Sequence, residues 1–249
     1  MRSSFFLLLG TLAYAFSISG GVGYEEQKIG GYIKNGNVIN YFGNKRANNP
    51  NKGYLGLKDE KNPFIWIKLT HDVPVFPNVK FQYTKYDASG YSNYIVGNVE
   101  IFDVKIPTVI TNAYTSMKID SYDVTFFYTF NSLFANIDAG IGVDYWKGHV
   151  KISTSNKTFV DNSWSVPLAY LYGKIETLKL YGVSLIGSFK WAKAGDNHHY
   201  DYLGAIKYNM PVNAFFKAGY RYKDIFGVDG DNETKLTYKG IFLEIGVEF

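Results

Sequence analysis

The sequence predicts an all-β protein, a transmembrane antiparallel up-and-down β-barrel with ten strands; eight or twelve strands are the alternatives. Three observations predict this fold. Ten segments of roughly ten residues alternate apolar and polar side chains, which is the period of a strand with two different faces. The connections alternate between short and long, as in transmembrane barrels. Aromatic residues make up 18% of the chain, and such barrels carry aromatic girdles at both membrane interfaces.

The composition excludes several classes of protein. The chain has no cysteine, so it has no disulfide framework, no thiolate metal site and no cysteine nucleophile. Its net charge of +4 is mild and spread along the chain, and we therefore predict no nucleic-acid partner. The mean hydropathy of −0.14 is too polar for a helical membrane protein. It suits a barrel, because only alternate strand residues face lipid there.

The first five predicted strands span residues 16–31, 63–71, 78–86, 119–130 and 133–146. Each has an apolar face that we expect to contact lipid, and each approaches or exceeds the 9–11 residues or so of a tilted transmembrane strand. The lipid-facing residues are predicted to be Phe16, Ile18, Val22 and Tyr24; Ile65, Ile67 and Leu69; Val79, Phe81 and Tyr83; Tyr122, Val124, Phe126, Tyr128 and Phe130; and Leu133, Ala135, Ile137, Ala139, Ile141 and Val143.

The last five predicted strands span residues 164–175, 180–191, 199–208, 212–225 and 240–249. Pro167 weakens the first of them as a strand, because proline cannot donate to the ladder. Their lipid-facing residues are predicted to be Trp164, Val166, Leu168, Tyr170 and Tyr172; Tyr181, Val183, Leu185, Phe189 and Trp191; Tyr200, Tyr202, Ile206 and Tyr208; Val212, Ala214, Phe216, Ala218, Tyr220 and Tyr222; and Ile241, Leu243, Ile245, Val247 and Phe249.

The connections indicate how the barrel is oriented. The short ones are at 72–77, 131–132, 178–179 and 210–211. The mostly longer ones, rich in Asn, Asp, Gly, Lys and Ser, are 34–62, 87–118, 147–162, 193–198 and 227–235. Short turns are periplasmic and long loops extracellular, so both termini are expected on the periplasmic side. Residues 93–106 also have strand character; they either extend the third or fourth strand or form an extracellular hairpin. The alternative for the whole pattern is a soluble secreted β-sandwich or lipocalin-like barrel.

The amino terminus has the three parts of a secretory signal peptide. Arg2 precedes a short apolar run over residues 5–12, and Ala13-Tyr14-Ala15 forms an A-x-A cleavage site. The apolar run is too short to span a bilayer as a helix, which needs about 20 apolar residues. We therefore expect a signal peptide over residues 1–15 and the barrel over residues 16–249.

The carboxyl terminus ends on an alternating strand with an aromatic last residue. Leu243, Ile245, Val247 and Phe249 lie on one apolar face, while the other face is mostly polar or small. This ending resembles the signal that the barrel-assembly machinery of Gram-negative bacteria reads. The resemblance implies an exported integral protein of the outer membrane. Its expected partners are that machinery during biogenesis, outer-membrane lipid and lipopolysaccharide, with an extracellular ligand left open.

The predicted inner face carries charges of both signs in similar number. These lumen-facing residues are Glu25, Lys68, Lys80, Gln82, Asp123, Asp138, Asp144, Lys190, Asp201, Lys217, Arg221, Glu244 and Glu248. Barrels of about eight strands are filled by side chains, whereas 16–18 strands leave a channel. We therefore predict a salt-bridged, largely filled lumen and a structural or surface-interaction role. The alternative is a narrow channel for ions or small solutes.

The segment from His71 to Asn78 is the most distinctive connection. Pro74, Pro77 and Asn78 between two apolar strands predict a rigid turn at one membrane face. The H-x-x-P-x-x-P-N pattern resembles the periplasmic turn of a family of Gram-negative outer-membrane β-barrel proteins that have no established substrate. The resemblance implies location and fold, and no mechanism.

The sequence offers little chemistry. Asp196-Asn197-His198 resembles half of the active site of omptins, which are ten-stranded outer-membrane proteases; those enzymes also need an Asp pair across the cleft. Asp87 and Asp103 stand alone in the second long connection, so no such pair is present. His198 and His199 are adjacent and point to opposite faces of a strand, so they chelate a metal poorly. We therefore predict no catalytic residues, no metal and no cofactor.

Overall fold

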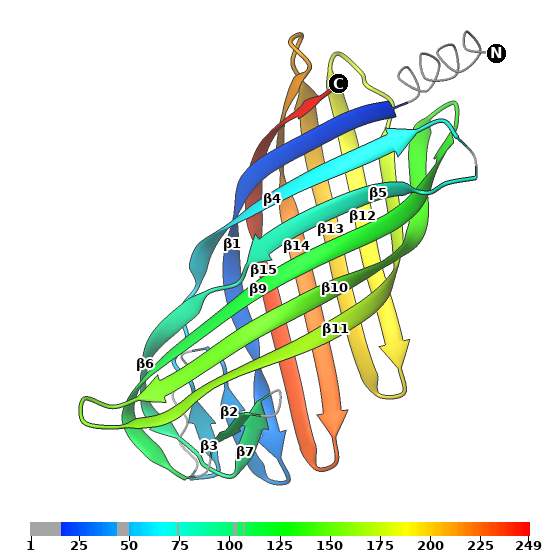
Figure 1. Cartoon of the computed structure of the whole chain (residues 1–249). Coiled ribbons are helices and arrows are strands. Elements are labelled where there is room, and N and C mark those ends of the chain that lie inside the picture. The colour runs from blue at the N-terminus through cyan, green and yellow to red at the C-terminus, as the bar shows by residue number, and fades with distance from the viewer. Residues whose placement is uncertain (1–15, 44–49, 74, 102–103, 107) are drawn as a thin grey trace, which may run out of the picture.

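The computed structural model describes residues 16–43, 50–73, 75–101, 104–106 and 108–249, so the predicted signal peptide lies outside the described residues. Ten strands form a closed antiparallel barrel, which confirms the predicted fold (Figure 1). Around the ring they are β1 (Phe16–Asn35), β4 (Glu60–His71), β5 (Asn78–Lys85), β9 (Ile110–Asn131), β10 (Ala135–Ser153), β11 (Thr158–Thr177), β12 (Val183–Ala194), β13 (Asn197–Asn209), β14 (Ala214–Asp229) and β15 (Asn232–Glu248).

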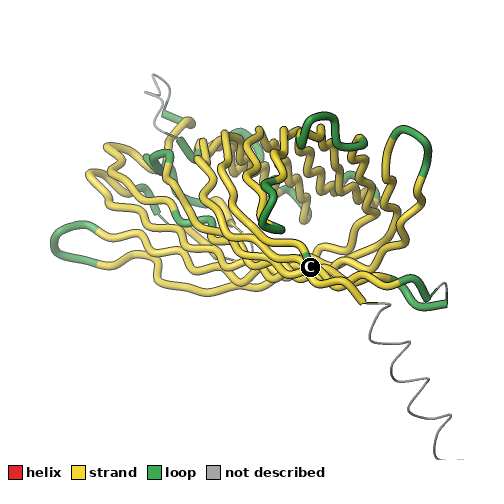
Figure 2. The backbone as a smooth tube through the Cα atoms, turned by 90° about the horizontal axis from the view of Figure 1, so that it is seen from above, coloured by secondary structure: helices red, strands yellow, loops and turns green. Residues whose placement is uncertain are grey.

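The pairing of β1 with β15 closes the ring. The ladder runs from Ser19 opposite Glu248 to Asn35 opposite Asn232. Beyond it, the Phe249 amide donates to the Ile18 carbonyl at 2.9 Å, so the chain terminus also joins the sheet. Figure 2 shows the strands from above as a flattened ring, with one wall running out sideways to a hairpin. Among the described residues, none forms a helix long and apolar enough to cross a membrane.

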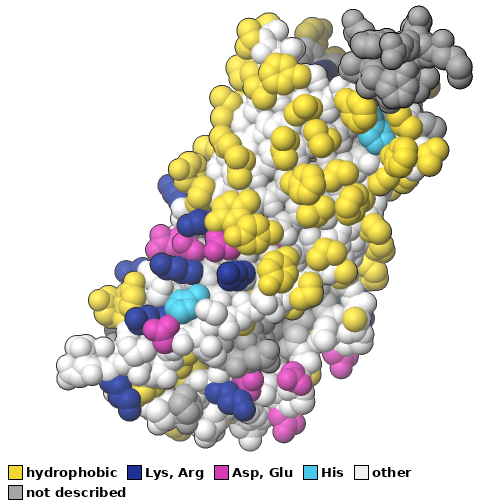
Figure 3. Space-filling view, in the orientation of Figure 1, with side chains coloured by type: hydrophobic (Ala, Val, Ile, Leu, Met, Phe, Trp, Pro, Cys, Tyr) yellow, Lys and Arg dark blue, Asp and Glu magenta, His cyan; other side chains and the backbone are white. Residues whose placement is uncertain are grey.

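An apolar band surrounds the end of the barrel where both termini lie (Figure 3). Its side chains are exposed and come from all ten strands; they include Ile18, Ile67, Phe81, Phe126, Ile141, Leu171, Leu185, Ile206, Phe216 and Ile245. Aromatic residues mark the far border of the band, among them Tyr24, Tyr122, Tyr145, Trp191 and Tyr220. A soluble protein does not expose such a continuous apolar surface, so this part of the barrel is the membrane-spanning part.

The predicted facing of β11 was wrong. Trp164 and Tyr170 are buried inside, at 7% and 4% exposure, whereas Leu171 and Ile175 are exposed on the outer face. The register explains the inversion, because Leu171 lies opposite Ile141 of β10, which also faces outward. Both faces of this strand carry apolar residues, so the alternation in the sequence did not distinguish them.

Two predicted extracellular loops are ends of strands. The 193–198 and 227–235 segments continue as β-ladders to Ala194 opposite Asn197 and to Asp229 opposite Asn232. Each hairpin then reverses over two residues, with φ of +60° at Gly195 and +58° at Gly230. Glycine adopts this left-handed backbone at no steric cost, which is why such short turns are possible here. The strands therefore run well beyond the apolar band.

The two long connections fold into the half of the barrel far from the carboxyl terminus, which the sequence predicts to be extracellular. They contain β2 (Val38–Tyr41), β3 (Lys52–Tyr54), β6 (Ala88–Ile95), β7 (Val99–Ile101) and β8 (Val104–Ile106). β2 pairs with β1, β3 pairs with β2, and β6 continues the line of β5 along β9. β7 and β8 pair with each other in a separate sheet. Residues 93–106 thus divide between the two predicted alternatives, because 93–95 extend the third predicted strand through β6 while 99–101 and 104–106 form the hairpin.

These segments build an apolar core, here called the plug core, together with the inner face of the barrel. Phe42, Leu55 and Leu57 from the first connection and Ile95 from the second are at most 2% exposed. They pack with buried barrel residues such as Ile33, Met117, Trp146, Val150, Leu236 and Tyr238. Burial in this core raises the pKa of Tyr86 and of Tyr238. The interior of this half of the barrel is thus apolar, although the sequence predicted polar loops here.

The predicted periplasmic turn is held by His71 and Asn78. The Val73 amide donates to His71 Nδ1 at 3.2 Å, so His71 Nε2 carries the proton and donates to the Pro77 carbonyl at 3.3 Å. The Asn78 side-chain oxygen accepts from the His71 amide at 2.9 Å. Pro74 lies outside the described residues. The turn between β4 and β5 therefore has polar contacts of its own, on the side of the barrel that holds the termini.

Candidate functional site in the barrel interior

Inward-facing charges form a layer directly beneath the plug core. Arg221 donates to both oxygens of Asp201, from Nε at 2.8 Å and from Nη2 at 2.5 Å, and its Nη1 lies 3.3 Å from Glu25. Lys223 lies 3.0 Å from Asp144 and 3.7 Å from Asp201. All five side chains are buried, so each charge is neutralised by a partner and not by water.

Asp123 of β9 accepts a second group of hydrogen bonds, beside Asp144 in the same layer. Lys190 donates to it at 2.5 Å, and the Tyr170 hydroxyl donates to both carboxylate oxygens at 2.8 and 2.9 Å. Thr125 adds a hydrogen bond at 3.1 Å. Tyr170 reaches this carboxylate because β11 turns its tyrosine inward, so the corrected facing of that strand supplies one of the donors.

A third layer combines aromatic rings with one ion pair. Trp66 Nε1 donates to Glu244 at 2.9 Å, and Lys217 lies 2.7 Å from the same carboxylate. The Trp66 ring stacks on Phe215 with centroids 6.2 Å apart, and Phe64 meets Phe242 edge-on at 6.1 Å. These four rings form a small buried cluster that narrows the lumen within the membrane-spanning part.

The layer nearest the termini contains three charges that sequence reasoning left out of the site. Glu176 lies 2.7 Å from Lys174 and 3.2 Å from Lys207, and Lys207 lies 2.5 Å from Glu248. Lys174 also lies 3.7 Å from Asp138. Lys174 and Glu176 were missed because the inverted facing of β11 put them outside. Lys207 and Lys223 were visible as polar residues that alternate with the outward faces of β13 and β14.

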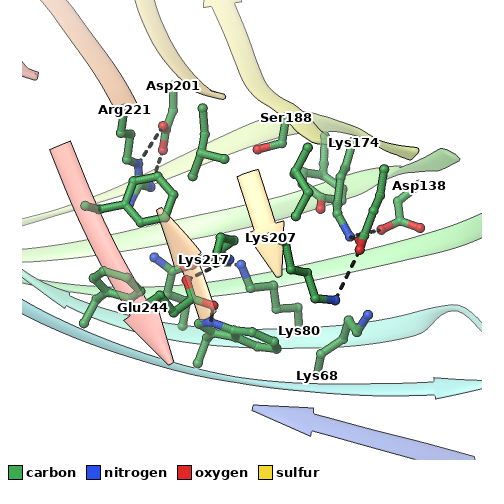
Figure 4. Close-up of a pocket in the computed structure, with 18 of the residues that line it drawn as sticks. Lys68, Lys80, Asp138, Lys174, Ser188, Asp201, Lys207, Lys217, Arg221 and Glu244 are labelled. Atoms are coloured by element: carbon green, nitrogen blue, oxygen red, sulfur yellow. Dashed lines mark hydrogen bonds and ion pairs between the residues drawn. The ribbon is translucent and has the colours of Figure 1, made fainter. Parts of the chain in front are cut away.

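All twelve charged residues predicted to face the lumen do lie inside the barrel, and ten of them line a narrow cavity of about 100 Å³. Asp123 and Asp144 are the two that do not line it; they are buried in the layers described above. A wider cavity of about 550 Å³ lies at the end near the termini and shares Lys68, Asp138, Lys174 and Glu176 with the narrow one. Figure 4 shows lysine side chains from several strands pointing into the narrow cavity.

The residues of the omptin-like motif are not arranged as a catalytic site. Asp196 lies in the exposed two-residue turn, whereas His198 stacks on Tyr200 with centroids 4.5 Å apart. The carboxylate that His198 contacts is Asp224, at 3.6 Å. His199 is buried on the opposite face of the strand, as predicted for adjacent residues. Within the described ranges, no three His, Asp or Glu side chains are grouped so that they could hold a metal.

Three solved structures match the chain at low sequence identity. The outer membrane protease OmpT from Escherichia coli matches with a TM-score of 0.53 and 9% identity, over 94% of this chain and 97% of that chain. Neisserial surface protein A matches with a TM-score of 0.36, 11% identity and coverages of 94% and 97%. Ail, the attachment invasion locus protein of Yersinia pestis, matches with a TM-score of 0.35 and 11% identity, over 94% of this chain and 99% of that chain.

No protein-family model and no curated protein matches the sequence. The resemblance drawn from the His71–Asn78 turn therefore stays a prediction. At 9% identity, the match to OmpT supports the barrel fold and nothing more specific. The order in which the strands pair is that of such a barrel. The chemistry of the interior has to be argued from its own contacts.

We predict that Asp201→Asn lowers the free energy of unfolding by about 3–5 kcal/mol, because it leaves Arg221 and Lys223 without the carboxylate that they share. Urea unfolding of the detergent-folded protein, followed by the gel shift between folded and unfolded barrel, measures the change. Asp229→Asn at an exposed hairpin end is the control and should change stability by less than about 0.5 kcal/mol. Equal small losses in both variants would contradict the prediction.

Proposed function

We propose that this protein is an integral outer-membrane barrel of the cell surface that conducts no solute and whose extracellular part contacts a partner. The apolar band and the fold shared with an outer-membrane protein support the location. The proposal keeps the sequence-based expectation of a structural or surface-interaction role with a filled lumen. It rejects the two alternative functions, a narrow channel and an omptin-like protease.

The plug core is the observation that carries the proposal. Trp146 stacks on Tyr86 with centroids 5.2 Å apart, and Tyr86 meets Tyr238 at 4.7 Å; all three are at most 1% exposed. Lys223 lies 4.9 Å from the centroids of the Tyr86 and Trp146 rings, so the charged layer joins the plug core without a gap. A hydrated ion that moved along the axis would have to enter this apolar packing, which is energetically unfavourable.

The extracellular part offers surface for a partner. β11 pairs with β12 only over Leu171–Glu176, so residues 158–170 have β10 on one side and no second ladder among the described strands. The hairpin of β10 and β11, at the lower left of Figure 1, therefore extends beyond its ladder with β12. Its outer face carries His149 and Lys151, both within 3.4 Å of Asp161. A folded, charged and extended hairpin of this kind suits contact with another macromolecule.

In planar lipid bilayers, we expect the reconstituted protein to show no unitary conductance above background. The physical reason is the apolar seal across the extracellular half. A variant in which residues 36–58 are replaced by a short Gly-Ser linker removes Phe42, Leu55 and Leu57, and we expect an increased ion leak from it. Its gel shift on heating verifies that the barrel still folds. Discrete conductance steps from the unaltered protein would contradict the proposal and favour the narrow channel.

The absence of native cysteine allows a direct test of orientation in the cell. We expect Asp231→Cys, at the exposed β14–β15 turn, to react in intact cells with a maleimide that cannot cross membranes. Leu133→Cys, 83% exposed in the turn between β9 and β10, should react only after the outer membrane is opened. The reverse pattern, or labelling of neither position after lysis, would contradict an outer-membrane location with both termini in the periplasm.

A further inference from the structure

Lys68 and Lys80 are directly opposite each other on the inner face of the barrel. They are paired residues in the antiparallel ladder between β4 and β5. Like charges at opposed positions of neighbouring strands destabilise a sheet, because their Cβ atoms are about 4.5–5.5 Å apart. Two ammonium groups held this close repel each other, and a negative charge between them would stabilise both.

The described part of the chain does not place a carboxylate against either ammonium group. Lys80 donates to the Gln82 side-chain oxygen at 2.9 Å and lies 5.4 Å from the centroid of the Trp66 ring. No ion pair or hydrogen bond of the Lys68 ammonium exists within the described residues. In Figure 4, both side chains point into the cavity.

The nearby carboxylates are engaged by other lysines. Lys174, Lys207 and Lys217 each form an ion pair in the two layers on this side of the barrel. Each of the four carboxylates nearby has at least one of these three lysines as its partner; they are Asp138, Glu176, Glu244 and Glu248. Lys68 and Lys80 are therefore the lysines on this side of the barrel that have no carboxylate partner among the described residues.

The two lysines are also reachable from one end of the barrel. Both line the narrow cavity of about 100 Å³, and Lys68 also lines the wider cavity of about 550 Å³ beside the termini. Toward the other end, the ring cluster around Trp66 and the charged layer of Arg221 and Asp201 fill the lumen. A volume of about 100 Å³ is several times the 10–15 Å³ or so that one water needs, so the cavity has room for a compact anion.

We propose that Lys68 and Lys80 form a binding site for a small oxyanion that enters from the periplasmic end of the barrel. Ammonium groups bind phosphate and carboxylate oxygens as point charges with several rotatable donors. An oxyanion between the two side chains replaces their mutual repulsion by two attractions. The site is separate from the extracellular part, so it does not depend on the proposed surface-interaction role.

The test measures the thermal stability of the full detergent-folded protein at pH 7 in sodium phosphate, in sodium malonate and in sodium chloride of equal ionic strength. A ligand that binds only the folded state raises the midpoint of unfolding. We expect a saturable rise with at least one oxyanion and no comparable rise with chloride. Phosphate and malonate distinguish a phosphate ligand from a carboxylate ligand.

Lys68→Met and Lys80→Met test the two residues separately. Each variant should weaken the apparent dissociation constant about tenfold or more, because a charge that contacts the anion is lost. In chloride alone each variant should unfold at a higher temperature than the unaltered protein, since the repulsion across the ladder is relieved. Lys80→Arg, which keeps the charge, should keep the response, as should Lys118→Met on the outer face of β9.

Three outcomes would overturn the site. They are an equal rise in chloride, no rise in either oxyanion, and a saturable rise that persists in both methionine variants. A loss of stability in chloride for both methionine variants would also count against it, because it would mean that the two lysines are satisfied within the protein. Every arm is independent of conductance, so a failure here leaves the proposed function as it stands.

Discussion

The ladder between β1 and β15 closes the ten-stranded sheet into a ring. Lipid offers no hydrogen-bond partner to a backbone group, so an open edge in lipid would leave a row of amides and carbonyls unsatisfied. Closure has a second consequence. In the closed ring, alternate residues on every strand point into the narrow lumen of a ten-stranded barrel. The side chains in that lumen determine whether the barrel is a channel or is filled.

The inside and the outside exchange character along the axis. In the membrane-spanning part the outer face is apolar and the inner face carries charges such as Asp201, Arg221 and Glu244. In the part beyond the apolar band the inner face is apolar, with Ile33, Trp146 and Leu236, and the outer face carries Lys118, Lys147 and Lys239. The period of two stays the same along each strand; only the solvent outside changes, from lipid to water. This exchange explains why the long strands kept their alternation beyond the band.

This exchange explains which features of the fold could be predicted from the sequence and which could not. Alternation placed the ten strands and put residues such as Lys217 and Arg221 inside, because period and facing are local properties. It failed for β11, where Tyr170 and Leu171 are both large and apolar enough to face lipid. It also could not show that the 36–58 segment folds inward, since Phe42, Leu55 and Leu57 lie in a connection that is mostly polar. Strand register is a property of two segments at once, so the opposition of Lys68 and Lys80 became visible only in the structure.

Removing one partner from a buried ion pair is costly, whereas the intact pair contributes little net stability. The layer of Arg221, Lys223, Asp144, Asp201 and Glu25 is complete in this sense, because every charge has a partner of opposite sign. Such a layer fixes the strands around it and is a poor candidate for binding, since a ligand would have to displace a satisfied partner. Lys68 and Lys80 differ because their charges are close together, half-buried and uncompensated. A binding site for a charged ligand is expected where buried charges lack partners within the protein. Among the described residues, the inner face of β4 and β5 is such a place.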